Sequence, residues 1–129
     1  MSKKDHSPPV ILVVDDSDAI REVLNIVLSE RGYNVVQAAD GHEAVEIATR
    51  GCPDLILMDL SMPVLDGYGA VQLLREVPET SNVPIVACTS HDTSEHRTKA
   101  FALGFNEYLT KPIDFFQLDN LVCRFLKAG

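Results

Sequence analysis

Short apolar runs alternate with longer segments of helical period along the whole chain, and this alternation constrains the fold more than any other feature. Five such runs stand out. Each has the length of a buried strand, and the segments between them are long enough to form helices. The runs are Val10 to Val14, Asn34 to Ala38, Leu55 to Met58, Ile85 to Cys88, and Tyr108 to Leu109.

This order predicts an α/β fold of (βα)5 type, a doubly wound parallel sheet with helices on both faces. Crossover connections between parallel strands are right-handed and place helices over the sheet. With 129 residues, of which 46% are hydrophobic, the chain fills one core and leaves no room for a second. We expect one domain over residues 10–128, preceded by a loose arm at residues 1–9.

The helical segments carry start and stop signals. The first has Ile20, Val23, Leu24, Val27 and Leu28 on one apolar stripe, with Gly32 placed to end the helix. Capping-box spacing opens the second and fourth segments, which should end near the glycines that follow them. These pairs are Asp40 with Glu43, before Gly51, and Asp92 with Glu95, before Gly104.

Composition narrows the class of function. Nineteen acidic against eleven basic residues give a net charge of -8, which disfavours direct contact with nucleic acid or anionic lipid. No apolar run has the length of a membrane span or the form of a secretory signal, so we expect a cytoplasmic protein without membrane insertion. The cysteines, Cys52, Cys88 and Cys123, share no metal-ligand spacing and read as reduced packing residues.

Polar side chains that could bind a metal ion or take part in a reaction follow four of the five strands. Asp15 and Asp16 end the first strand, Asp59 the third, Thr89 and Ser90 the fourth, and Thr110, Lys111 and Pro112 the fifth. The carboxyl ends of parallel strands meet at one crevice, where such folds build their sites. Three carboxylates gathered there repel one another unless a cation joins them, and their hard oxygen ligands suit Mg²⁺.

Each feature alone has an ordinary structural explanation. An Asp-Asp pair caps helices, Asp59 alone would be a loop carboxylate, and Lys-Pro often marks a strand exit. Their joint position at one edge of the sheet favours chemistry instead. A metal on one side and a lysine on the other suffice for phosphoryl transfer to a carboxylate nucleophile, for which Asp59 is the candidate.

These motifs resemble those of response-regulator receiver domains. They cover nearly the whole chain and stand in the order and spacing of that family. The motifs are Val-Asp-Asp ending at Asp16, Leu-Met-Asp-Leu-Ser-Met-Pro-Val-Leu-Asp-Gly ending at Gly67, Cys-Thr-Ser ending at Ser90, and Tyr-Leu-Thr-Lys-Pro ending at Pro112. The resemblance implies the flavodoxin-like receiver fold with strand order 2-1-3-4-5.

The resemblance also assigns roles. Asp59 would accept a phosphoryl group from a histidine kinase or a histidine phosphotransfer protein. Asp15, Asp16 and Asp59 would bind Mg²⁺ with the main-chain carbonyl of Ser61, Asp16 more directly than Asp15. Lys111, aimed into the pocket by a cis peptide bond to Pro112, would pair with the phosphoryl oxygens. Thr89 would sense the bound group, and Tyr108 would then move from an exposed to a buried position.

Two variable positions of the family and two departures from its usual residues characterise this chain. Ser61 and His91 lie where the family varies and are expected to set the dephosphorylation rate, and Ser90 replaces a smaller residue. Phe116 points about 160° away from the stripe led by Leu118, so the last helix should expose it. Beside Tyr108, it would mark a docking spot for a downstream protein partner, although a single exposed aromatic needs no functional explanation.

The sequence therefore predicts a phosphoryl-accepting switch that catalyses only its own reactions, as a monomer or a weak phosphorylation-linked dimer. It is compatible with a free-standing regulator and with a receiver taken from a longer chain. Two other classes compete. A metal-dependent phosphohydrolase would need a further acid or base, for which Asp66 is the spare carboxylate. A flavodoxin-like cofactor binder is disfavoured, because three acids oppose a bound phosphate without metal.

Overall fold

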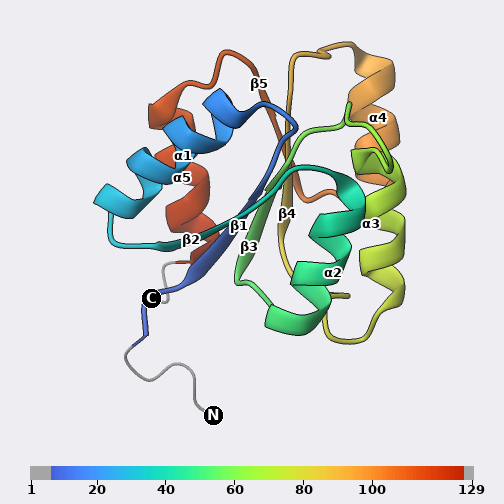
Figure 1. The fold of residues 1–129 in the computed structure, drawn as a ribbon. Coiled ribbons are helices and arrows are strands. Elements are labelled where there is room, and N and C mark those ends of the chain that lie inside the picture. Colours follow the sequence, from blue (N-terminus) through green and yellow to red (C-terminus); the bar gives the residue numbers. More distant parts are fainter. Residues whose placement is uncertain (1–6, 127–129) are drawn as a thin grey trace.

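The protein folds as a three-layer α/β structure in a computed structural model that describes residues 7–126 (Figure 1). Five parallel strands form one sheet in the order β2-β1-β3-β4-β5, as predicted. The strands are β1 (Val10–Val14), β2 (Asn34–Ala38), β3 (Leu55–Met58), β4 (Ile85–Thr89) and β5 (Glu107–Thr110), and the helices are α1 (Asp18–Glu30), α2 (Gly41–Gly51), α3 (Gly67–Glu76), α4 (Ser94–Leu103) and α5 (Phe115–Leu126).

The helices divide between the two faces of the sheet, with α1 and α5 on one side and α2, α3 and α4 on the other (Figure 1). Alternate strand residues point to opposite faces and build two separate cores. In β1, Ile11 and Val13 pack with Leu24 of α1 and Leu118 of α5. Leu12 and Val14 belong to the second core, with the small side chains of α2 and α3. Strands buried on both faces explain the continuous apolar runs in the sequence.

The helix boundaries agree with the sequence signals in the first two helices. Asp40 caps α2 by accepting from the main-chain N–H of Glu43, whose carboxylate accepts from Ala39 N at 2.7 Å. Gly32 follows α1 with a positive φ of 95°. Within the predicted apolar stripe, Leu24 and Leu28 are buried, Ile20 and Val27 are half-buried, and Val23 is 46% exposed. The wider face of α1 is therefore not fully covered.

The start of α4 differs from the prediction. Its N-cap is Thr93, whose side chain accepts from the main-chain N–H of His96. Asp92 instead forms an ion pair with Arg97, at 2.9 Å. The Asp92 and Glu95 spacing was therefore misread as a capping box. A threonine one residue further on competes for the same role, and spacing alone does not distinguish the two.

The predicted arm falls mostly outside the described residues, since the description begins at Ser7. Pro9, assigned to that arm, accepts a hydrogen bond from Asn34 N at 3.0 Å and so belongs with the sheet. None of the helices described between residues 7 and 126 is long and apolar enough to cross a bilayer.

Candidate functional site

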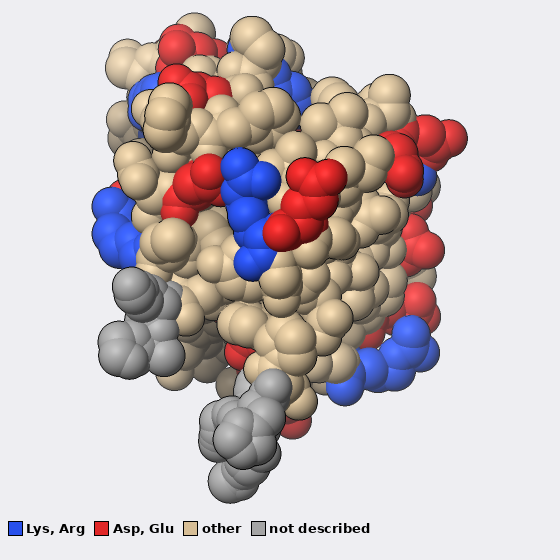
Figure 2. All heavy atoms as spheres, turned by 90° about the vertical axis from the view of Figure 1, so that its left-hand side faces the viewer, with Lys and Arg blue, Asp and Glu red and all other residues tan. Residues whose placement is uncertain are grey.

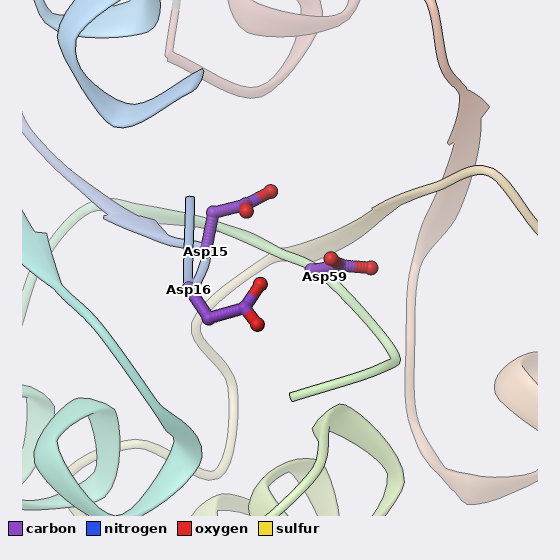
Figure 3. Close-up of side chains that lie close together, drawn as sticks. All are labelled: Asp15, Asp16 and Asp59. Atoms are coloured by element: carbon purple, nitrogen blue, oxygen red, sulfur yellow. The ribbon is translucent and has the colours of Figure 1, made fainter. Parts of the chain in front are cut away.

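Three carboxylates converge where β1 and β3 end (Figure 3). One oxygen from each of Asp15, Asp16 and Asp59 can be chosen so that all three lie within 4.8 Å of one another. Parallel neighbours β1 and β3 carry them to the same level, because Val14 pairs with Met58 directly before the acids. Asp15 and Asp59 are buried, whereas Asp16 is exposed.

Lys111 brings the opposite charge into this cluster from the end of β5. Its Nζ lies 2.7 Å from Asp15 Oδ2 and 3.1 Å from Asp59 Oδ2. Burial lowers the pKa of the Lys111 ammonium, but the hydrogen bonds that Lys111 donates to Asp15 and Asp59 outweigh this effect and leave the pKa raised. The peptide bond between Lys111 and Pro112 is cis, as the resemblance implied.

The two adjacent aspartates differ in how far they are already engaged. Asp15 accepts from Ser17 N at 2.9 Å in addition to its ion pair with Lys111. Asp16 makes no hydrogen bond within residues 7–126 and faces solvent. Its carboxylate is therefore the more available of the two, in keeping with the more direct metal contact expected for Asp16.

The main chain at Asp59 is held by the end of β1 and by the start of α3. Asp59 N donates to Val14 O at 3.0 Å, and the Asp59 carbonyl lies against Gly67. A Cβ at Gly67 would lie 2.3 Å from Asp59 O, so only glycine allows this approach. Asp66 caps α3 by accepting from Gly69 N at 2.9 Å. The carboxylate considered as a spare acid is thus a helix cap.

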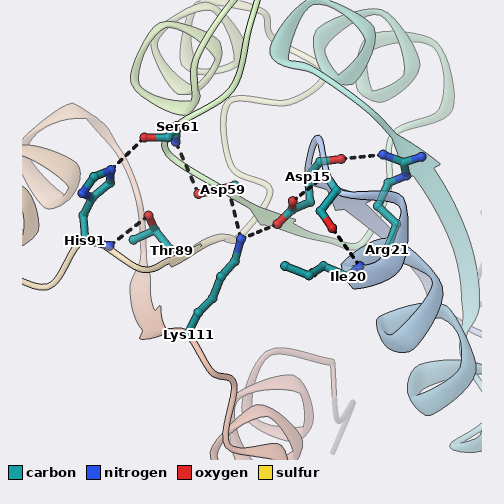
Figure 4. A network of polar contacts seen from close by, with 9 residues as sticks. Asp15, Ile20, Arg21, Asp59, Ser61, Thr89, His91 and Lys111 are labelled. Atoms are coloured by element: carbon teal, nitrogen blue, oxygen red, sulfur yellow. Dashed lines mark hydrogen bonds and ion pairs between the residues drawn. The ribbon is translucent and has the colours of Figure 1, made fainter.

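A second set of polar contacts borders Asp59 on the side of β4 (Figure 4). Ser61 N donates to Asp59 Oδ1 at 3.3 Å, and a hydrogen bond of 2.8 Å joins Ser61 Oγ to His91 Nε2. Thr89 is fully buried, and its Oγ1 accepts from His91 N at 3.3 Å. The structure therefore brings Ser61, Thr89 and His91 together beside Asp59.

Tyr108 and Phe116 lie further from the carboxylates. Tyr108 is 6% exposed and its hydroxyl donates to the main-chain carbonyl of His91, so it holds the buried position rather than the exposed one expected at rest. Phe116 is 82% exposed, as predicted. The two are on different faces: Tyr108 packs in the core beneath α4, whereas Phe116 belongs to α5.

The geometry agrees with a comparison of the sequence with known families. The model of the family described as response regulator receiver domain matches residues 11–122. The chain belongs to this family. As a receiver domain, it is a phosphoryl-accepting signalling module of the two-component type rather than an enzyme acting on external substrates.

Relatives of this receiver domain occur both as short proteins and within long ones. The chain is 37% identical to an uncharacterized 14.6 kDa protein of Leptolyngbya boryana over 92% of its own length and 90% of that protein. It is 35% identical to the signal transduction histidine-protein kinase BarA of Escherichia coli, where 89% of the chain matches only 12% of the kinase. The similarity to BarA thus concerns one small part of a much longer protein.

A solved structure shares the fold closely. The receiver domain of the sensor histidine kinase PA1611 from Pseudomonas aeruginosa superimposes with a TM-score of 0.87 at 35% identity, over 95% of this chain and all of that domain. In that structure a magnesium ion is coordinated in the active-site cleft.

One residue of the site was missed from the sequence. Arg21 in the first turn of α1 donates from Nη1 to the Asp15 carbonyl at 2.7 Å (Figure 4). Its Nε donates to the side-chain carbonyl of Gln37 at 3.2 Å. It thereby fixes the main chain between the two aspartates. A cation near a helix N-terminus opposes the helix dipole, and that unfavourable placement was the available signal.

Proposed function

We propose that this receiver domain stores a signal as an aspartyl phosphate on Asp59. The observation that carries the proposal is the cluster of three carboxylates, with oxygens within 4.8 Å of one another, of which Asp15 and Asp59 pair with Lys111. Three negative charges and one positive charge leave a net charge of two minus, which one divalent cation would neutralise. Mg²⁺ is the ion that this set of oxygen ligands favours.

Asp15, Asp16 and Asp59 would hold Mg²⁺ with the main-chain carbonyl of Ser61, and the ion would neutralise charge on the transferred phosphoryl group. An Asp59 carboxylate oxygen attacks phosphorus of a phosphohistidine, in a histidine kinase or a histidine phosphotransfer protein. The P–N bond breaks, its electrons stay on the imidazole nitrogen, and that nitrogen takes up a proton. Lys111 pairs with phosphoryl oxygens as the transfer proceeds.

Thr89 and Tyr108 would read the occupancy of Asp59. Thr89 ends β4, the neighbour of the strand that carries Asp59, and its Oγ1 would donate to a phosphoryl oxygen while still accepting from His91 N. Tyr108 is linked to the same loop through the His91 carbonyl. A shift of Thr89 would therefore reach Tyr108 through one residue.

Ser61 and His91 would set the rate at which Asp59 loses its phosphoryl group. Their hydrogen bond of 2.8 Å joins the loops after β3 and β4 on one side of Asp59, where a hydrolytic water would approach. Self-catalysed loss would be the only hydrolysis, because Asp66 is occupied as the α3 cap. Exchange of Ser61 for alanine should change the lifetime of the adduct and not its formation by a small donor.

A downstream protein would recognise the face around β5, with Phe116 as an apolar contact. The exposed fraction of Phe116, 82%, exceeds that of its neighbour Phe115, 39%, so Phe116 contributes little to the core. Phe116→Ser should weaken binding of that partner without lowering the free energy of unfolding. Leu73→Ser on α3, 43% exposed, is the matched control, and equal loss in both variants would contradict a specific role.

We place this protein in the cytoplasm. It would act as a monomer or a weak phosphorylation-linked dimer and would not contact nucleic acid directly. Cys52, Cys88 and Cys123 are all free thiols, as expected in a reducing compartment. Burial raises the pKa of the Cys88 thiol to about 12, so this side chain serves packing and is unreactive.

The surface charge does not favour nucleic acid. Figure 2 shows acidic side chains beside the basic ones on the face bearing α1 and α5, not a continuous basic surface. Cell fractionation and sedimentation of the phosphorylated protein would test location and assembly.

The deciding experiment uses a small phosphoryl donor. The protein is incubated with acetyl phosphate and Mg²⁺, and its intact mass is recorded beside Asp59→Asn and beside a sample with EDTA. One phosphoryl adduct that requires both Asp59 and Mg²⁺ is expected. Rapid turnover of varied phosphate esters would favour the hydrolase, and no adduct with any donor would favour a receiver that only binds partners.

A further inference from the structure

His91 is a junction between the acceptor pocket and Tyr108. Its main-chain N–H donates to Thr89 Oγ1, its carbonyl accepts from the Tyr108 hydroxyl, and its ring bonds to Ser61 Oγ. Each of these groups must keep its place for the junction to work. His91 itself is exposed and lies in the loop between β4 and α4, so little packing restrains its ring.

His96 supplies the missing restraint. Its ring stacks on that of His91, with 4.7 Å between the ring centroids and 14° between the planes. A hydrogen bond of 2.6 Å between His96 Nδ1 and Thr93 Oγ1 fixes the His96 ring in turn. Since His96 lies in the first turn of α4 and Thr93 is the N-cap of that helix, the stack attaches the loop after β4 to a helix. Among the described residues, the contacts of His96 are with Thr93 and His91, and no hydrogen bond joins it to the carboxylate cluster.

Tyr108 is held inward by protein contacts on several sides. Besides its bond to the His91 carbonyl, the Arg97 guanidinium lies 4.6 Å from the centre of the Tyr108 ring. Arg97 is itself paired with Asp92 in the same loop. The ring of Phe101 stands 6.5 Å away. Most of these contacts come from residues 91–101, so the buried position of Tyr108 depends on how that segment is arranged.

We propose that His96 is a positioning residue that, by stacking on His91, fixes the loop after β4 and keeps Tyr108 in its inward position independently of phosphorylation. On this view the receiver has its tyrosine already inward at rest, and phosphorylation at Asp59 shifts an equilibrium that the histidine pair has biased. The inference goes beyond the proposed function. It rests on that function only in taking the position of Tyr108 as the signal that a partner reads.

The test observes Tyr108 directly and needs no phosphoryl donor. Protein labelled with 3-fluorotyrosine is studied by ¹⁹F NMR at pH 8, with the Tyr108 signal assigned by Tyr108→Phe and distinguished from Tyr33 and Tyr68. The wild type should show a predominantly buried Tyr108. His96→Ala should raise the ratio of exposed to buried Tyr108 about 2- to 10-fold, from the strength typical of an aromatic pair.

Three variants separate stacking from other effects of the substitution. His96→Phe keeps an aromatic ring and should restore the wild-type signal, whereas His96→Asn keeps a polar group for Thr93 and should not. His42→Ala removes an exposed histidine of α2 and should leave Tyr108 unchanged. Thermal unfolding is followed in parallel, since a merely structural role would make the Tyr108 signal track stability rather than the presence of a ring.

An exposed Tyr108 in the wild type, or a Tyr108 signal unaffected in both His96→Ala and His96→Asn, would overturn the inference. So would a failure of His96→Phe to restore the signal in a protein as stable as the wild type. These outcomes are independent of the acceptor chemistry. If the acetyl phosphate experiment failed, the ¹⁹F result would stand, and the reverse also holds.

Discussion

Two partly buried cations hold opposite ends of the same sheet, and they are bound in opposite ways. Lys111 lies at the carboxyl ends of the strands and bonds to two carboxylates, Asp15 and Asp59. Arg75 of α3 lies near the amino ends of β4 and β5. Its acceptors among the described residues are all neutral oxygens: the carbonyls of Thr80, Ser81, Val83 and Gly104, and the side-chain amide of Asn106.

The difference separates architecture from chemistry. Burial lowers the pKa of the Arg75 guanidinium, with no carboxylate to offset it, while the pKa of Lys111 is raised by its acidic partners. The planar fork of Arg75 is fully engaged and ties two connections together, so it has no capacity for a ligand. The partners of Lys111 are charged groups that a metal ion and a phosphoryl group would share. The contacts of Arg75 therefore favour stability, whereas the incompletely neutralised carboxylates around Lys111 are the groups that the proposed function uses.

Removal of the Lys111 ammonium should have the largest effect on function. Lys111→Met keeps the aliphatic stem and removes the charge that meets the phosphoryl oxygens. We expect the rate of adduct formation from acetyl phosphate to fall roughly 10²- to 10³-fold, the loss typical of one electrostatic group in a transition state. Time courses of intact mass at saturating Mg²⁺ would measure it.

Lys111→Arg is the matched control for that change, because it keeps the charge and alters the geometry. It should recover part of the rate. If Lys111→Met formed the adduct as fast as the wild type, Lys111 would be only a structural cation, and the contrast with Arg75 would disappear.

Removal of the Arg75 guanidinium should instead act on stability. Arg75→Met leaves several carbonyls of two connections without donors, and we expect the free energy of unfolding to fall by about 2 kcal/mol. Urea unfolding would measure this. Arg75→Lys restores the charge without the fork and should recover less than half of the loss. Adduct formation per folded molecule should stay within about twofold of the wild type, and a larger loss would show that the two ends are coupled.

The fold was predictable because its signals are local and repeated. The three inner strands β1, β3 and β4 are apolar runs buried on both faces, whereas the edge strands β2 and β5 are only partly buried. The strand order followed from the family resemblance rather than from the residues. The errors fall where two local solutions compete. Thr93 displaced Asp92 as the α4 cap, and Val23 stayed exposed although its spacing fits the stripe. Spacing gives the direction of a side chain, but not whether another element covers it.

The candidate site divides in the same manner. Asp15, Asp59 and Lys111 were predictable, since strand ends of a parallel sheet must meet at one edge. The bond from Ser61 to His91 and the stack of His91 on His96 were not. They join loops through side-chain rotamers, which no periodicity specifies. Arg75 was missed for a related reason: its carbonyl acceptors are main-chain atoms, which leave no trace in residue type.

The smallest predicted effect is a rise in stability on binding Mg²⁺. It tests whether the metal binds at the carboxylates around Lys111 and not near Arg75. The three carboxylates and Lys111 carry a net charge of two minus, so Mg²⁺ should bind the folded protein. At a free Mg²⁺ concentration tenfold above Kd, it should raise the free energy of unfolding by about 1.4 kcal/mol. Thermal unfolding with and without Mg²⁺ should show a rise in Tm of roughly 3–6 °C.

Two variants locate the bound metal. Asp16→Asn should lose most of the shift in Tm, because Asp16 is the exposed carboxylate with no hydrogen bond within residues 7–126. Arg75→Met should keep the full shift from a lower starting Tm, since its neutral acceptors bind no metal. A shift that persisted in Asp16→Asn and vanished in Arg75→Met would place the metal at the wrong end of the sheet and refute the division between the two cations.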